Sequence, residues 1–121
     1  MTLINRGLPN FVVPKDDNSW MLIYNGNEMD GSYIVFPIPK SDLRELFKVR
    51  LFDNLNAQFG ILIDECEEEE ISGIENLQEL KSIINQYFEQ DQLPIVKYYL
   101  EKMLYLVDKA IEYNTVIMFY F

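Results

Sequence analysis

The chain has 121 residues, of which 49% are hydrophobic and 14% aromatic, and its net charge is -10. This length and composition predict a single globular domain, residues 1–121, with a packed core, and they exclude a disordered chain. Recognition of nucleic acid and of anionic membranes depends on Lys and Arg. The negative charge therefore predicts that the chain binds neither of them directly.

The absence of histidine and the presence of a single cysteine, Cys66, exclude several kinds of chemistry. No Ser-His or Cys-His nucleophile pair, no His-containing zinc site and no internal disulfide can form. The glycines form no phosphate-binding loop. Two carboxylates could act as general acid and base, but no pair stands out among twenty acidic residues. We therefore expect a protein that is not an enzyme and has no cofactor.

The N-terminal segment has no apolar stretch of signal-peptide length, and no later stretch approaches about 18 consecutive apolar residues. These features predict a cytoplasmic protein without a membrane span. The single Cys66 agrees with a reducing compartment.

Two short apolar runs in the first third of the chain predict a β-hairpin. Residues 20–24 (WMLIY) and 33–39 (YIVFPIP) are rich in β-forming residues, and Asn-Gly and Asp-Gly pairs between them favour turns. Pro37 and Pro39 cannot donate backbone hydrogen bonds, so the second strand should lie at a sheet edge or end there. Residues 11–13 predict a further brief edge strand.

A helix is predicted from an N-cap at Ser41 to about Phe52, because apolar residues recur every four positions. Whether residues 53–58 are helix or turn stays open. Gly60 interrupts the pattern, and residues 61–63 (Ile-Leu-Ile) predict a central strand.

This predicted strand runs directly into a one-sided block of charge. Eight acidic residues fall within sixteen positions, and the first basic residue after them is Lys81. The eight are Asp64, Glu65, Glu67, Glu68, Glu69, Glu70, Glu75 and Glu79. Residues 64–121 hold thirteen acidic and four basic residues, a net charge of -9, so most of the excess charge lies in this half. Like charge at this density requires full solvation or a cationic partner.

Three explanations of the acidic run differ in what they require. A solvated loop, helped by the positive end of the following helix, accounts for one or two carboxylates. A calcium loop interleaves acidic residues with Asn and a turn Gly, and residues 67–70 lack both, so we expect no metal. A basic protein partner accounts for the whole run. The partner-binding residues predicted on this basis are Asp64, Glu65, Glu67, Glu68, Glu69, Glu70 and Glu75.

The second half of the chain predicts two helices and a final strand. Residues 72–75 (Ser-Gly-Ile-Glu) have the form of a capping box that starts the first helix. Asp91 is placed to cap the second helix, residues 93–112, with Pro94 in its first turn. Residues 115–121 (TVIMFYF) predict a strand that is tucked into the sheet.

The predicted order is therefore β-β-α-β-α-α-β. It indicates an α+β fold in which about three helices cover a small mixed or antiparallel sheet.

Residues 59–65 (FGILIDE), followed by EEEEI at 67–71 and a capped helix, resemble immunity proteins of bacterial contact-dependent growth inhibition and related polymorphic toxin systems. The resemblance covers chiefly residues 59–80, together with size and charge. It implies a small cytosolic protein that binds one cognate toxin domain, commonly a basic nuclease, and blocks its active site or substrate groove. It transfers no binding residue to this chain, so the interface above rests on charge alone.

An acidic regulatory or adaptor module that docks onto a host or phage enzyme is the alternative function. The sequence does not separate it from an immunity protein, and it leaves the oligomeric state open.

Overall fold

The computed structural model describes residues 8–121 and shows an α+β fold with a four-stranded antiparallel sheet and five helices. The strands are β1 (Asn10–Pro14), β2 (Tyr33–Pro37), β3 (Glu68–Ser72) and β4 (Val116–Tyr120), in the spatial order β2-β1-β4-β3. The helices are α1 (Asp17–Tyr24), α2 (Lys40–Lys48), α3 (Leu51–Phe59), α4 (Ile74–Phe88) and α5 (Pro94–Tyr113). The expected fold class is confirmed, but there are five helices where about three were predicted. The prediction that the N-terminal segment is not a signal peptide concerns in part residues 1–7, which lie outside the described residues.

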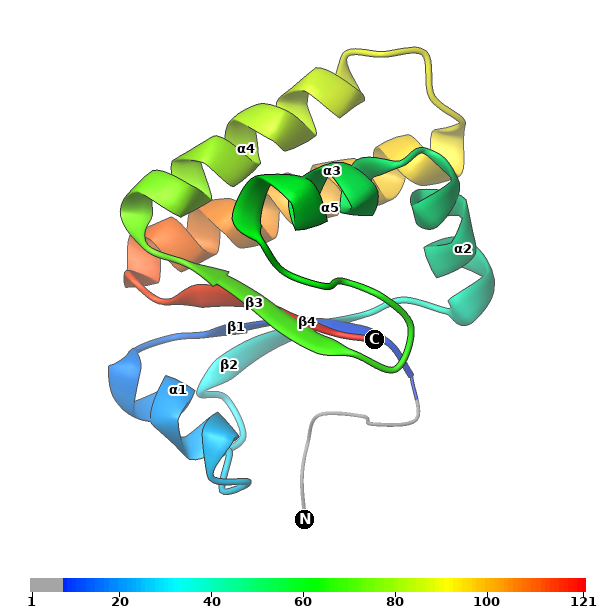
Figure 1. Cartoon of the computed structure of the whole chain (residues 1–121). Helices are drawn as coiled ribbons and strands as arrows, with labels where there is room; N and C mark the ends of the chain where they lie inside the picture. Colours follow the sequence, from blue (N-terminus) through cyan, green and yellow to red (C-terminus); the bar gives the residue numbers. More distant parts are fainter. Residues whose placement is uncertain (1–7) are drawn as a thin grey trace.

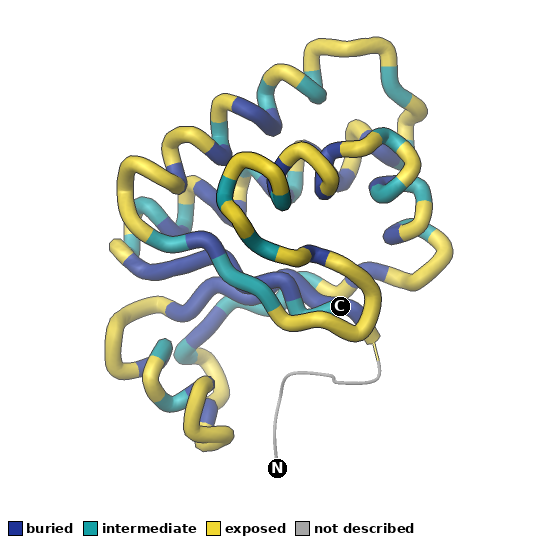
Figure 2. The backbone as a smooth tube through the Cα atoms, viewed as in Figure 1, coloured by how far each residue is buried: buried dark blue, intermediate teal, exposed yellow. Residues whose placement is uncertain are grey.

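The two inner strands, β1 and β4, are covered on both faces of the sheet. Helices α2 to α5 lie on one side and α1 on the other (Figure 1). Phe11 and Phe119 point into the helix layer, whereas Val12 and Met118 point toward α1, and all four are buried. Figure 2 shows both strands as almost entirely buried. This burial explains their continuous apolar sequences, since neither face can carry polar side chains without cost.

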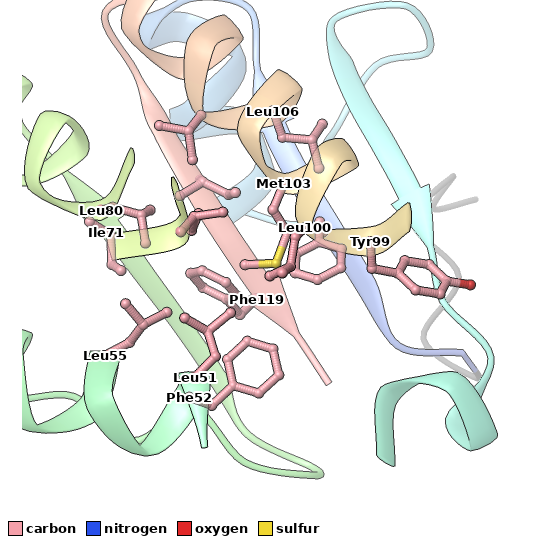
Figure 3. Close-up of a cluster of buried hydrophobic side chains, with 14 of the residues drawn as sticks. Leu51, Phe52, Leu55, Ile71, Leu80, Tyr99, Leu100, Met103, Leu106 and Phe119 are labelled. Carbon is pink, nitrogen blue, oxygen red and sulfur yellow. The ribbon is translucent and has the colours of Figure 1, made fainter. Parts of the chain in front are cut away.

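Aromatic rings join the helix layer to the sheet. Phe119 packs edge-on against Phe11 at 5.7 Å and against Phe52 of α3 at 6.3 Å between ring centroids. Phe52 and Phe119 lie close together among the leucines of the helices (Figure 3). Edge-to-face rings at such distances add favourable interactions to the burial of apolar area.

Residues 20–24 are helical, so the predicted hairpin is wrong. The Asp16 side chain accepts a hydrogen bond from the backbone N–H of Ser19 at 2.7 Å and thereby caps α1. Strand β2 pairs with β1 instead, with Val12 opposite Val35. A five-residue apolar run fits a short helix as well as a strand, and here the capping residue before the run decides.

The two N-terminal strand predictions have opposite outcomes. The 11–13 strand, predicted at an edge, is the inner strand β1 and is buried along its length. Strand β2 lies at an edge of the sheet and ends at Pro37, and both outcomes agree with the prediction from its prolines.

The helix predicted from Ser41 is two helices, and Pro39 rather than Ser41 is the N-cap of the first. Arg50 separates α2 from α3 with a φ of 70°, in the left-handed region that cannot continue a helix. Residues 53–58, left open above, belong to α3.

The remaining differences concern where elements begin. Residues 61–63 form no strand, and β3 begins at Glu68, seven positions after the predicted start at Ile61. Gly73 is the N-cap of α4 and Leu93 that of α5, and neither helix has a side-chain cap, so the roles predicted for Ser72 and Asp91 are wrong. Pro94 does occupy the first turn of α5.

The observed and predicted caps give a paired test. We expect Asp16→Ala to lower the midpoint of thermal unfolding by several degrees at neutral pH, because it removes the cap of α1. Ser72→Ala should change stability by less than about 0.5 kcal/mol, since Ser72 caps nothing. Circular dichroism melts measure both, and equal effects of the two substitutions would contradict the cap assignment.

The effect of Asp16 should also depend on pH. The hydrogen bond from Ser19 lowers the pKa of the Asp16 carboxyl below its ordinary value of 3.8. A lowered pKa contributes stability above the unfolded-state pKa and loses it as the pH falls through the folded-state pKa. The difference between wild type and Asp16→Ala should therefore shrink when the melts are repeated at progressively lower pH below about 4.

A second stability prediction concerns Tyr99 of α5, whose hydroxyl donates to the Asp42 carboxylate in the first turn of α2 at 2.6 Å. Burial and this hydrogen bond both raise the pKa of Tyr99. Tyr99→Phe should cost about 1–2 kcal/mol of unfolding free energy in denaturant titrations. Tyr98→Phe, on the exposed neighbouring ring, is the matched control and should be nearly neutral.

Candidate protein-interaction site

A clamped loop sets the position of the acidic run. Helix α3 ends at Gly60, whose φ of 66° turns the chain into residues 61–67. The Asn56 side chain then accepts a hydrogen bond from the Ile63 N–H at 2.6 Å and donates to the Ile63 carbonyl at 3.2 Å. Ile63 is buried, so the loop has an apolar anchor in addition to these two hydrogen bonds. The acidic residues after Ile63 therefore start from a held position.

A tight turn leads from this loop into β3. The Glu67 N–H donates to the Asp64 carbonyl at 3.2 Å, and Cys66 within the turn has a φ of 65°. The Phe121 N–H donates to the Glu67 carbonyl at 3.1 Å, which extends the pairing with β4 beyond the end of the strand. Asp64, Glu65 and Glu67 are exposed on this turn.

The pleat of β3 divides its three glutamates between the two faces of the sheet. Glu68 lies opposite Tyr120 and Glu70 opposite Met118, on the face that carries α1. Glu69 alternates with them and shares the helix side with buried Ile71. The structure thus aligns Glu68 and Glu70 on one face, about 7 Å apart along the strand, and turns Glu69 away from them.

Tyr24, the last residue of α1, meets this pair of glutamates. Its hydroxyl donates to the carboxylate of Glu70. Tyr24 is 53% exposed, and partial desolvation together with this hydrogen bond raises the pKa of Tyr24 to about 12. The tyrosine therefore stays a neutral donor that holds the Glu70 carboxylate in place at physiological pH.

A shallow pocket of about 250 Å³ lies on this face. It is lined by Tyr24, Glu68, Glu69, Glu70, Met118 and Tyr120. The pocket thus combines carboxylates, two aromatic rings and a methionine side chain, a composition that suits a cationic group carried on an apolar stem.

The remaining predicted residues occupy other positions. Glu65 lies 3.8 Å from the Arg44 guanidinium in an exposed ion pair. Glu75 lies in the first turn of α4, and Glu79 lies one turn further along. Helix α4 follows the C-terminal end of β3, whereas the turn at Cys66 precedes its N-terminal end. Within residues 8–121, Glu67, Glu69 and Glu70 have no ion-pair partner. The eight acidic residues therefore do not form one continuous surface.

Three residues of this site were not predicted from the sequence: Tyr24, Met118 and Tyr120. The strand predicted at residues 20–24 obscured Tyr24, although Asp16 and the turn at Gly26 bracket a helix there. The period-two pattern of β4 does separate Met118 and Tyr120 from Phe119, but only the pairing with β3 places them beside the glutamates.

Among residues 8–121, no three Cys, Asp or Glu side chains converge in a way that could hold a metal ion. None of the helices in this part of the chain has the length and apolar character needed to cross a bilayer. Comparisons of the chain with protein-family models, with curated proteins and with solved structures give no match.

The Tyr24–Glu70 contact predicts a tyrosine that titrates late. In wild type the Tyr24 ring should ionise near pH 12 instead of its ordinary value of 10. Glu70→Gln removes the carboxylate charge and should lower this pKa, while leaving the fold intact because Glu70 lies at a sheet edge. Carbon NMR of ring-labelled tyrosine measures the change, with Glu79→Gln as the control. An unchanged Tyr24 titration in Glu70→Gln would contradict the contact.

Proposed function

We propose that this chain is a cytosolic immunity protein that binds and neutralises a cognate toxin domain, a basic nuclease. Its binding surface is formed by the turn at residues 64–67 and the outer face of β3. The observation that carries the proposal is the alignment of Glu68 and Glu70 beside an aromatic pocket on an open edge of the sheet. The resemblance of residues 59–80 to immunity proteins of polymorphic toxin systems supports the same function.

The proposed mechanism is electrostatic. A nuclease holds the phosphates of its substrate with Lys and Arg side chains, so a rigid group of carboxylates can occupy the same groove. The excess negative charge of the whole chain would steer the basic partner toward this surface and raise the association rate.

The pocket would supply specificity, because charge alone attracts many basic proteins. A Lys or Arg side chain of the toxin that enters it would place its stem against Met118 and its charge near Glu70. The ring of Tyr24 would add a cation–π contact. A basic protein without a side chain at the matching position would gain only the long-range attraction.

The gene next to that of this chain provides the direct test. An immunity gene should lie beside the 3′ end of a large toxin gene, so we would co-express the C-terminal domain of that neighbour with this chain. We expect the two to co-purify and the cells to survive an otherwise toxic domain. Absence of both binding and protection would reject the immunity function.

Charge reversal then tests the surface. We expect Glu67→Lys, Glu68→Lys and Glu70→Lys, made together, to slow association with the toxin domain at low salt by about tenfold or more. The rate should also lose most of its salt dependence, because fewer charges attract the partner at long range. Stopped-flow measurements at several ionic strengths give both quantities.

The control carries the same change in net charge at a distant place. Glu89→Lys, Asp91→Lys and Glu101→Lys alter exposed residues around the α4–α5 connection, far from β3 (Figure 1). If both triple variants slow association equally, the net charge of the chain acts and the β3 surface has no special role.

A further inference from the structure

The second open edge of the sheet, along β2, has a different character from the β3 edge. The Ile38 N–H donates to the Pro9 carbonyl and the Lys15 N–H to the Ser32 carbonyl, which fixes the alternation of the ladder between β1 and β2. In this alternation Val35 directs its backbone N–H and carbonyl away from β1, toward the outside of the sheet. Strand β2 thus presents hydrogen-bonding groups with antiparallel geometry to any strand that approaches it.

Strand β2 itself carries no charged side chain, although on the adjoining surface of α5 the Lys102 ammonium lies 5.4 Å from the centre of the Tyr98 ring. Residues 31–39 contain no Asp, Glu, Lys or Arg, whereas the β3 edge carries three glutamates in succession. Natural sheets block edge-to-edge association with charged side chains, short strands or proline. On β2 only Pro37 serves this purpose, and it lies at the end of the strand.

The apolar surface continues from β2 onto α5. Ile34, Val35 and Phe36 are only half-buried. Phe36 packs edge-on against Tyr99 at 6.2 Å between ring centroids, and Tyr99 packs in the same way against Tyr98 at 5.0 Å. Tyr98 is itself exposed. A partner strand beside β2 would therefore bury side chains as well as pair its backbone.

We infer that β2 pairs with β2 of a second copy of this chain, so that two four-stranded sheets join into one continuous antiparallel sheet. A two-fold axis at Val35 pairs the Val35 N–H and carbonyl of each copy with those of the other. This register sets Ile34 opposite Phe36 of the partner subunit and Phe36 opposite the partner's Ile34. Cross-strand pairs of an aromatic and a β-branched side chain are among the favourable ones. Pro37 ends the ladder, because it has no N–H to donate.

Two copies of this chain could also join through β3 and β3 or through β2 and β3, but charge disfavours the first pairing and symmetry the second. Pairing β3 with β3 would bring the glutamates of both strands together, with strong like-charge repulsion. Pairing β2 with β3 joins unlike surfaces and gives an open chain of copies, whereas β2 with β2 closes as a dimer. The β2 dimer also places the acidic β3 edges at the far ends of the joined sheet, where two chains that each carry a charge of -10 repel least. The inference does not depend on the proposed immunity function, since both acidic edges stay accessible.

Sedimentation velocity of the intact chain between about 1 and 100 µM tests the inference, because this range covers the affinity of a modest interface. We expect a twofold increase in mass above that of the 14.4 kDa chain. Val35→Pro removes the outward N–H without affecting the β1 ladder and should return the protein to a monomer. Val35→Thr keeps both the N–H and the branched shape, and it should remain a dimer.

If Val35→Pro fails to fold, amide hydrogen exchange of the wild-type protein still tests whether β2 forms the dimer interface. The Val35 N–H should exchange at least about tenfold more slowly in concentrated than in dilute protein, because only the dimer bonds it. A monomer throughout the concentration range, an open-ended series of larger species, or a dimer in which Val35 exchange is independent of concentration would each overturn the inference.

Discussion

The pairing of β1 with β4 is the interaction on which the rest of the fold depends. It joins segments from opposite parts of the sequence, with Phe11 opposite Phe119. The buried Thr115 hydroxyl donates to the Pro14 carbonyl at 2.7 Å and closes one end of this pair. One face of the two strands supports the helix layer and the other supports α1, while β2 and β3 attach at their outer sides. Strands β2 and β3 and helices α1 and α5 therefore contact this central pair directly, and α4 packs in turn on α5 and β3.

The same arrangement gives the sheet two unlike edges. Glutamates are poor strand formers, yet β3 accepts three of them because an edge strand leaves alternate side chains in solvent and gains its stability from β4. Strand β2 is apolar because its side chains face the core on one side and α1 on the other. One edge thus suits a cationic partner and the other an apolar one, and both properties follow from the order of the four strands.

Sequence patterns predicted those elements whose own periodicity is strong. Helix α5 and strand β4 were located to within about two residues, because a long amphipathic stretch and a long apolar run each fit one structure. The failures concern short runs. Residues 20–24 and 61–63 both have strand-like composition, but the Asp16 cap makes the first a helix and the Asn56 clamp holds the second as a loop. The acidic residues were recognised by their charge, whereas their division between two faces depends on where β3 begins, which long-range pairing decides.

The sequence distance between β1 and β4 bears on when the acidic surface exists. Contacts between segments about 100 residues apart raise the contact order of the fold, so the chain must close a large loop before its central sheet forms. An unfolded chain still carries the full run of carboxylates, but only the finished sheet aligns Glu68 with Glu70 and brings Tyr24 to them. A ligand that requires this alignment would bind the native state alone, and its presence would protect the protein from unfolding and from proteolysis.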